Sequence, residues 1–155
     1  MSATQHLHGA PVHAGRANVT AVHYTSFSSA RAHLKEILDA AEVGLPASIT
    51  RGGTRSVVVH GGRLVSLLAQ SRPAHTQVVH ENGTWAAMLP GAPLAGEGET
   101  FDEAIDDLVS ALRDYAQDWM DRLHVAPNHA DQWTLVQLIE LSEDEQLRDW
   151  LLAAS

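Results

Sequence analysis

The fold of this chain is decided by residues 100–119, which read TFDEAIDDLVSALRDYAQDW. Thr100 and Glu103 have the spacing of a capping box, in which two side chains bind unpaired backbone N–H groups of the first helical turn. The apolar residues recur at steps of three and four, namely Phe101, Ala104, Ile105, Leu108, Leu112, Tyr115 and Trp119. The sequence therefore predicts a long amphipathic helix that begins after Thr100.

A β-hairpin is predicted just before this helix. Its two strand-like runs, residues 77–81 and 84–89, are separated by Asn82-Gly83, the dipeptide most typical of a type I′ turn. Residues 90–98 contain two prolines and three glycines, which predicts a loop.

Two further helices are predicted beyond Pro127. Residues 131–141 form an apolar periodic stretch, and Ser142 with Glu145 has the spacing of a second capping box. We therefore expect the chain to end in a helical arm.

The first half of the chain predicts a smaller unit. Residues 18–23 alternate in polarity as a short strand does, and Ser28 offers a cap for an amphipathic helix over residues 29–43. The glycine turn RGGT at residues 51–54 joins two β-rich runs and predicts another hairpin. A short helix is expected over residues 63–70.

Together these elements predict an α+β chain in four parts. We expect a flexible tail over residues 1–17 and a domain of strand, helix, hairpin and short helix over residues 18–72. A hairpin-helix segment over residues 76–122 and a helical arm over residues 128–155 follow.

Composition excludes several classes of protein. The chain has 155 residues and no Cys, so it can bury only a modest core and has no thiol nucleophile. No apolar stretch approaches the ~20 residues that cross a bilayer, and no secretory signal begins the chain, so we expect a cytoplasmic protein without membrane contact. No common catalytic or phosphate-binding motif occurs, so we expect neither an enzyme nor a cofactor. His124 and His129 flank Pro127, but a metal site there is the less favoured interpretation.

Charge is divided unevenly about Pro73. Residues 1–72 carry seven basic and three acidic side chains, a net of +4, whereas residues 73–155 carry three basic and sixteen acidic, a net of −13. This asymmetry predicts a polyanionic partner for the first half and a basic partner for the second. Chance together with a solvated acidic face is the alternative.

Residues 19–70 resemble the Phd/YefM (prevent-host-death) family of type II antitoxins. The resemblance lies in SSARAHLKEILDAAEVGLP at residues 28–46 and ITRGGTRSVVV at residues 49–59. It implies a dimer that binds palindromic DNA in its own operon, and a C-terminal extension that wraps a toxin. The chain departs from the family at His33, where Asn is frequent, and at Arg55-Ser56, where a basic residue is often followed by Pro.

Residues 78–119 separately resemble part of a HicB-type antitoxin module. The segment ENGTWAAMLPGAPLAGEGETFDEAIDDLVSALRDY is similar to the hairpin, proline-glycine loop and G-x-T-x-x-E-A helix of that family. The closing strands of the HicB fold are absent, so this segment is either half of that fold or a convergent hairpin and helix. Both resemblances imply an antitoxin.

DNA binding requires cations that meet phosphates and base edges. The candidates are Arg31, Lys35, Arg51, Arg55 and Arg63. The Phd/YefM resemblance implies DNA contacts at Arg31 and Arg51 in particular. A homodimer would double these charges across two half-sites of operator DNA. Surface charges that only solubilise the chain are the alternative.

Toxin binding requires apolar anchors among acidic residues, because toxins that cleave RNA are commonly basic. The candidates are Trp119, Trp133, Val136, Ile139, Leu147, Trp150 and Leu151. Their helical spacing favours docking in a groove of the toxin. Packing of the same residues on the chain's own core is the alternative.

The sequence therefore predicts an antitoxin that neutralises a cognate basic toxin, of RelE/ParE-like type by family habit, and represses its own operon. A stand-alone DNA-binding regulator with a C-terminal sensor half is the second hypothesis. An interaction module without a DNA role is the third.

Overall fold

The computed structural model describes residues 20–153, which form two compact units with their boundary in the sequence between Val59 and His60. The tail predicted over residues 1–17 lies outside the described residues. Both units combine helices with a small sheet, so the predicted α+β class is confirmed.

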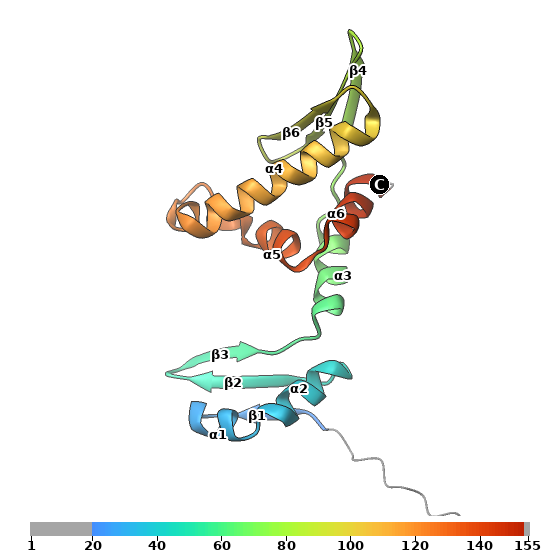
Figure 1. Cartoon of the computed structure of the whole chain (residues 1–155). Coiled ribbons are helices and arrows are strands. Elements are labelled where there is room, and N and C mark those ends of the chain that lie inside the picture. Colours follow the sequence, from blue (N-terminus) through green and yellow to red (C-terminus); the bar gives the residue numbers. More distant parts are fainter. Residues whose placement is uncertain (1–19, 154–155) are drawn as a thin grey trace, which may run out of the picture. The chain divides into compact units, whose positions relative to one another are not determined.

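The first unit is a three-stranded sheet with two short helices (Figure 1). Its elements are β1 (Val22–Tyr24), α1 (Phe27–Ala32), α2 (Leu34–Glu42), β2 (Ala47–Arg51) and β3 (Thr54–Val57). The central strand β2 runs parallel to β1 and antiparallel to β3. Gly52 and Gly53 have φ of 54° and 82°, so the predicted glycine hairpin is confirmed, and Arg51 pairs with Thr54 across its turn.

The single helix predicted over residues 29–43 is divided in two at His33. The His33 backbone leaves the helical region, with φ −120° and ψ 29°, while its ring bonds the carbonyl of Ser29 at 2.9 Å and stacks on Tyr24. A side chain that bonds the backbone locally competes with the helix. The prediction that Ser28 caps this helix is also wrong. The side chain of Ser26 instead accepts the hydrogen bond from the first turn.

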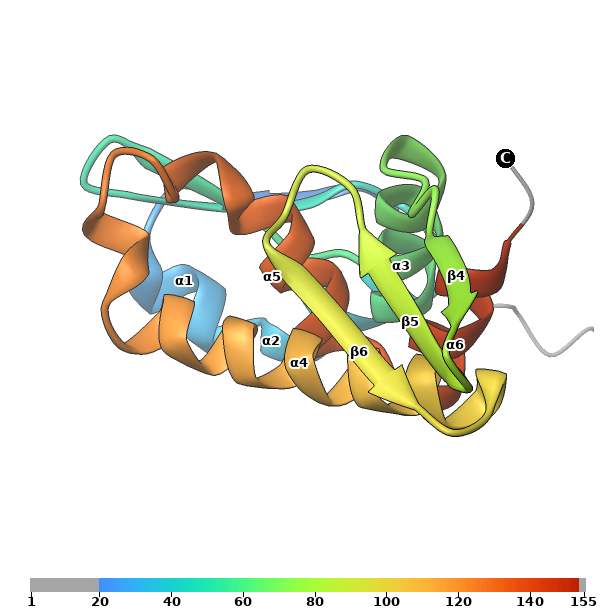
Figure 2. The same ribbon diagram turned by 90° about the horizontal axis from the view of Figure 1, so that it is seen from above.

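The second unit has an antiparallel sheet and helices (Figure 1, Figure 2). Its strands are β4 (Gln77–Glu81), β5 (Thr84–Leu89) and β6 (Leu94–Gly98), and its helices are α3 (Gly61–Ser71), α4 (Phe101–Asp121), α5 (Trp133–Leu141) and α6 (Asp144–Leu152). Two 3-10 turns, Leu123–Val125 and Ala130–Gln132, connect α4 to α5. The sheet lies on one side of α4, and α5 and α6 lie on the other.

The predicted turns and caps of this unit are mostly confirmed. Asn82 and Gly83 have φ of 51° and 80°, as a type I′ turn requires, and Thr100 and Glu103 form both bonds of a capping box. The second box lies one residue later than predicted, at Glu143 and Gln146. Ser142 instead ends α5, because its backbone is extended.

The prediction of a loop over residues 90–98 is wrong, because residues 94–98 form the strand β6. Gly96 lies so close to α4 that a Cβ atom there would be 2.2 Å from the backbone N of Leu108 and 2.4 Å from the carbonyl O of Ala104. Gly98 is similarly close, with 2.7 Å to the backbone N of Ala104. These glycines therefore permit close packing of a strand on a helix, and they do not mark a loop.

The short helix α3, which we predicted as part of the first domain, belongs to the core of the second unit. Val65 and Leu68 on α3 are buried with residues of α4 and α5, and Trp150 on α6 donates from its indole Nε1 to the carbonyl of Arg72 at 2.8 Å.

No helix among the described residues is long and apolar enough to span a membrane.

Replacing Gly96 by Ala tests the contact of β6 with α4. We expect the free energy of unfolding to fall by about 3 kcal/mol, because the added methyl group meets helix backbone that cannot move aside. Gly61→Ala is the matched control, since no atom lies within 4 Å of a Cβ built there, and we expect it to change stability by less than about 0.5 kcal/mol. Urea unfolding measures both, and equal stability of the two variants would contradict this packing.

Candidate functional surfaces

The basic residues of the first unit lie on α1, on α2 and at the glycine turn. Arg31 is exposed in the last turn of α1. Arg51 and Arg55 flank the turn on opposite faces of the hairpin, because side chains alternate along a strand. Arg51 also lines a surface hollow of about 360 Å³ with Phe27, the first residue of α1. The fold thus brings the turn beside the helix that carries Arg31.

The other two predicted DNA contacts are placed less favourably. Lys35 forms an ion pair with Asp39 at 2.5 Å, and this hydrogen bond raises the pKa of Lys35. Glu36 and Glu42 lie on the same helix, so α2 has a net negative charge. Arg63 lies on α3 in the second unit. Among the described residues of the first unit, Arg31, Arg51 and Arg55 are thus the exposed cations without an ion pair.

The first unit also exposes large apolar side chains. Leu34 and Leu38, one turn apart on α2, are each 52% exposed, and Phe27 on α1 is 57% exposed. The core of this unit is built instead from smaller residues and one isoleucine: Ala30, Ile37, Ala40 and Ala47. An apolar surface on so small a unit is typical of an interaction site.

The predicted toxin contacts lie mostly in the interior of the second unit. Five are at most 6% exposed: Val136, Ile139, Leu147, Trp150 and Leu151. Trp119 is half-buried, and its indole Nε1 donates to the carbonyl of His129 at 2.8 Å. Trp133, at the start of α5, is 54% exposed and is the one of the seven that lies open on this unit's surface. A partner reaches the five buried residues only if the unit opens.

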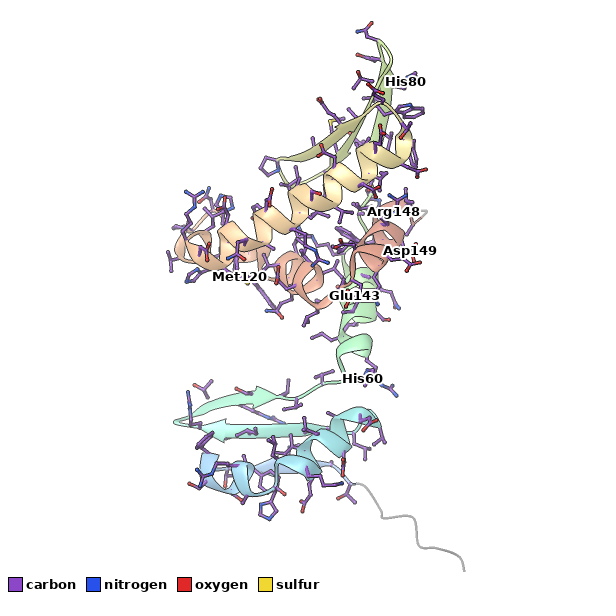
Figure 3. The ribbon with its side chains drawn as sticks, in the orientation of Figure 1. His60, His80, Met120, Glu143, Arg148 and Asp149 are labelled. Carbon is purple, nitrogen blue, oxygen red and sulfur yellow. The ribbon has the colours of Figure 1, made fainter. Side chains whose placement is uncertain are left out.

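Two arginines hold α5 and α6 to α4. Arg148 lies on α6 (Figure 3). It binds the carboxylates of Asp102 and Asp106 in the first turns of α4, and the hydrogen bonds to these acids raise the pKa of Arg148. Arg113 on α4 binds Asp144 at 2.7 Å and donates to the carbonyls of Ile139 and Ser142. Sequence reasoning missed these roles. The low number of basic residues in this part of the sequence could have indicated these roles, since residues 73–155 contain three in all.

The histidines considered as a metal pair have other partners. His124 bonds the carbonyl of Trp119 at 3.1 Å, and His129 bonds the hydroxyl of Tyr115 at 3.1 Å. Burial raises the pKa of that Tyr115 hydroxyl. Within residues 20–153, no three His, Cys, Asp or Glu side chains are grouped so that they could hold a metal ion.

Comparison with known proteins relates this geometry to a family. Over most of its length the fold is similar to the crystal structure of an antitoxin part of a putative toxin/antitoxin system from Syntrophomonas wolfei subsp. wolfei. The TM-score is 0.70 at 21% sequence identity, and the match covers 83% of this chain and 95% of that chain. No curated protein sequence matches the chain.

The sequence itself matches a family model over both units. The model is described as PHD-like, an antitoxin of toxin–antitoxin, RelE/RelB, TA systems, and the match covers residues 22–151. Such antitoxins are regulatory proteins and not enzymes. The match includes the cationic first unit as well as the acidic second unit, so the chain belongs to the PHD-like family of antitoxins of RelE/RelB toxin–antitoxin systems.

Proposed function

We propose that this antitoxin neutralises its cognate toxin by direct binding and represses its own operon as a homodimer on palindromic DNA. The Phd/YefM resemblance of the first half agrees with this division of roles, and the HicB-type resemblance stays a prediction about fold. The proposal rests on one small unit that exposes both arginines without ion pairs and large apolar side chains.

DNA contact is assigned to Arg31, Arg51 and Arg55. A guanidinium group binds phosphate or guanine through two hydrogen bonds, and these three are not neutralised by carboxylates within the described residues. Gly52 and Gly53 keep the turn between Arg51 and Arg55 narrow, so it can approach a DNA groove. Lys35 and Arg63 remain secondary candidates, the first because Asp39 already binds it and the second because it lies outside the first unit.

Dimerisation is assigned to the exposed apolar residues of the first unit. A single copy offers three unpaired arginines, which is few for specific binding at physiological salt. A two-fold dimer doubles them and matches a palindromic site. Burying Leu34 and Leu38 against a second copy would also remove apolar surface from water, at about 25 cal/mol per Å².

Toxin binding is assigned to the second unit because of its charge. Residues 60–153 carry five basic and sixteen acidic side chains, a net of −11. Four of the five arginines, Arg72, Arg113, Arg122 and Arg148, already bind acceptors within the unit. A basic toxin of RelE/ParE-like type is complementary to such a surface, and the exposed Trp133 is a suitable anchor.

Arg31→Ala and Arg51→Ala test the DNA contacts. We expect each to weaken binding to the upstream operator by about ten- to a hundredfold in a gel shift at fixed salt, because a dimer loses two contacts per substitution. Arg122→Ala removes an exposed cation that is paired with Asp118 and should bind as the wild type does. A wild-type chain that fails to shift the operator at low salt would rule out the repressor function.

Replacing both Leu34 and Leu38 by Ser tests the dimer. We expect the molar mass from light scattering to fall from that of two chains to that of one, since polar side chains no longer favour the buried surface. Leu67→Ser is the control, because Leu67 is 62% exposed on α3 in the other unit. A wild-type chain that is monomeric at micromolar concentration refutes this part of the proposal.

Trp133→Ala and Trp150→Ala form a matched pair for toxin binding. Trp133→Ala should leave unfolding nearly unchanged and weaken binding of the neighbouring operon product by about 2 kcal/mol, as loss of an exposed aromatic anchor does. Trp150→Ala should destabilise the second unit by about 3–5 kcal/mol, because it removes a buried ring and its bond to Arg72. Calorimetry measures both quantities. Unchanged toxin affinity of the Trp133 variant would exclude that residue from the interface.

A further inference from the structure

Strand β4 has an unpaired outer edge in the second unit. Glu81 and Thr84 flank a two-residue turn and pair across it, so the backbone groups of Gln77, Val79 and Glu81 face β5 and those of Val78 and His80 point outward. No hydrogen bond from the described part of the chain reaches these outward groups. The strand also has no Lys, Pro or bulge, the features by which proteins commonly protect such an edge.

The opposite edge of the same sheet is closed. The outward N–H of Glu97 on β6 donates to the carboxylate of Asp107 on α4 at 2.9 Å, and just beyond the strand the N–H of Glu99 donates to Glu103 at 2.9 Å. Helix α4 thus occupies the space that a further strand next to β6 would need. Within the described residues of this sheet, β4 is the edge where a strand can be added.

A cavity adjoins the open edge. It has a volume of about 320 Å³ and is lined by Val78 of β4, Phe101 of α4, Leu151 and Leu152 of α6, and by His75, Thr76 and Ala153. A strand paired with β4 would place every second side chain on the same face as Val78, next to this cavity. Strand addition commonly combines backbone bonds for affinity with such a pocket for specificity.

Thr76, one of the residues that line this cavity, has an unsatisfied polar atom. The hydroxyl Oγ1 of Thr76 is buried and has no hydrogen-bond partner in the described structure. Buried polar groups are nearly always bonded, and one left without a partner is costly. The lining thus contains a polar group whose bond no described residue supplies.

Charge distinguishes between the possible occupants of the edge. Residues 73–112 contain no Lys or Arg, and they carry seven acidic residues: Glu81, Glu97, Glu99, Asp102, Glu103, Asp106 and Asp107. A second copy of β4 would bring two such acidic sheets together, which like charges oppose. A segment with Lys or Arg beside its apolar residues is favoured instead.

We propose that β4 is a strand-addition site for an extended, basic segment of the cognate toxin, one of whose side chains fills the adjoining cavity. The identity of the partner rests on the proposed function. The toxin segment would then form main-chain hydrogen bonds with Val78 and His80, so its binding depends on backbone N–H groups of β4 as well as on side chains.

His80→Pro and His80→Ala test this site as a matched pair. His80 lies on β4 (Figure 3). Its ring stacks on Trp85 at 4.5 Å between ring centroids, and both variants lose that ring. Only proline removes the outward N–H, and an edge strand tolerates proline there because β5 does not use that group. We expect the full chain with His80→Ala to bind the basic protein encoded beside it within about threefold of wild type, and His80→Pro to lose about tenfold or more. Urea unfolding of each variant shows that both are folded.

Amide hydrogen exchange of the wild-type chain gives a second measurement. In the free chain we expect Val79 and Glu81 to be protected and Val78 and His80 to exchange fast; the toxin should protect the latter two. The site is overturned if the toxin binds without protecting Val78 and His80 and if both variants bind it with equal affinity. That outcome leaves the proposed function standing. A wild-type chain that does not bind the neighbouring protein overturns both. Protection that rises with chain concentration alone identifies a second copy and overturns the toxin as occupant.

Discussion

The second unit depends on the packing of α4 between the sheet and the C-terminal helices. On one side, β6 approaches so closely that Gly96 has no room for a side chain. On the other side, α5 and α6 bury the apolar residues of α4, and Arg148 binds two carboxylates of its first turns. Helix α3 joins the same core through α5. Since a packed interior tolerates little change of volume, α4 fixes which surfaces of this unit remain free.

This packing buries most of the C-terminal residues that the sequence predicts as toxin contacts. Residues 133–152 form two helices inside a folded unit, and Trp150 is 6% exposed. Apolar residues at helical spacing are as typical of a helix that packs on its own chain as of one that docks on a partner. Under the proposed function, the surface that binds the toxin is therefore made from what α4 leaves outside: the exposed Trp133, the acidic helix faces and the edge of β4.

Local signals in the sequence predicted most of the elements. Asn82-Gly83, the glycine turn after Arg51 and the capping box at Thr100 act through neighbouring residues, so their patterns can be read without the fold. The strand β6 could not be predicted, because Gly96 is required by a helix that follows it in the sequence. The burial of Trp150 depends likewise on Arg72, distant in sequence. The sequence proposed Arg31, Lys35 and Arg51 alike as DNA contacts, and only the structure shows that Asp39 binds Lys35.

A folded second unit has thermodynamic consequences for partner binding. An arm that is disordered until it meets its partner loses conformational entropy on binding, at a cost of about 2–5 kcal/mol or more of the interaction energy. The helices α5 and α6 are already ordered by contacts within the chain, so a partner that docks on the unit does not bear this cost. Binding to the folded state then stabilises it further by mass action. Strand addition at β4 would also avoid this entropy cost. Pairing with β5 already keeps β4 extended, so the outward backbone groups of Val78 and His80 are in position before a partner binds.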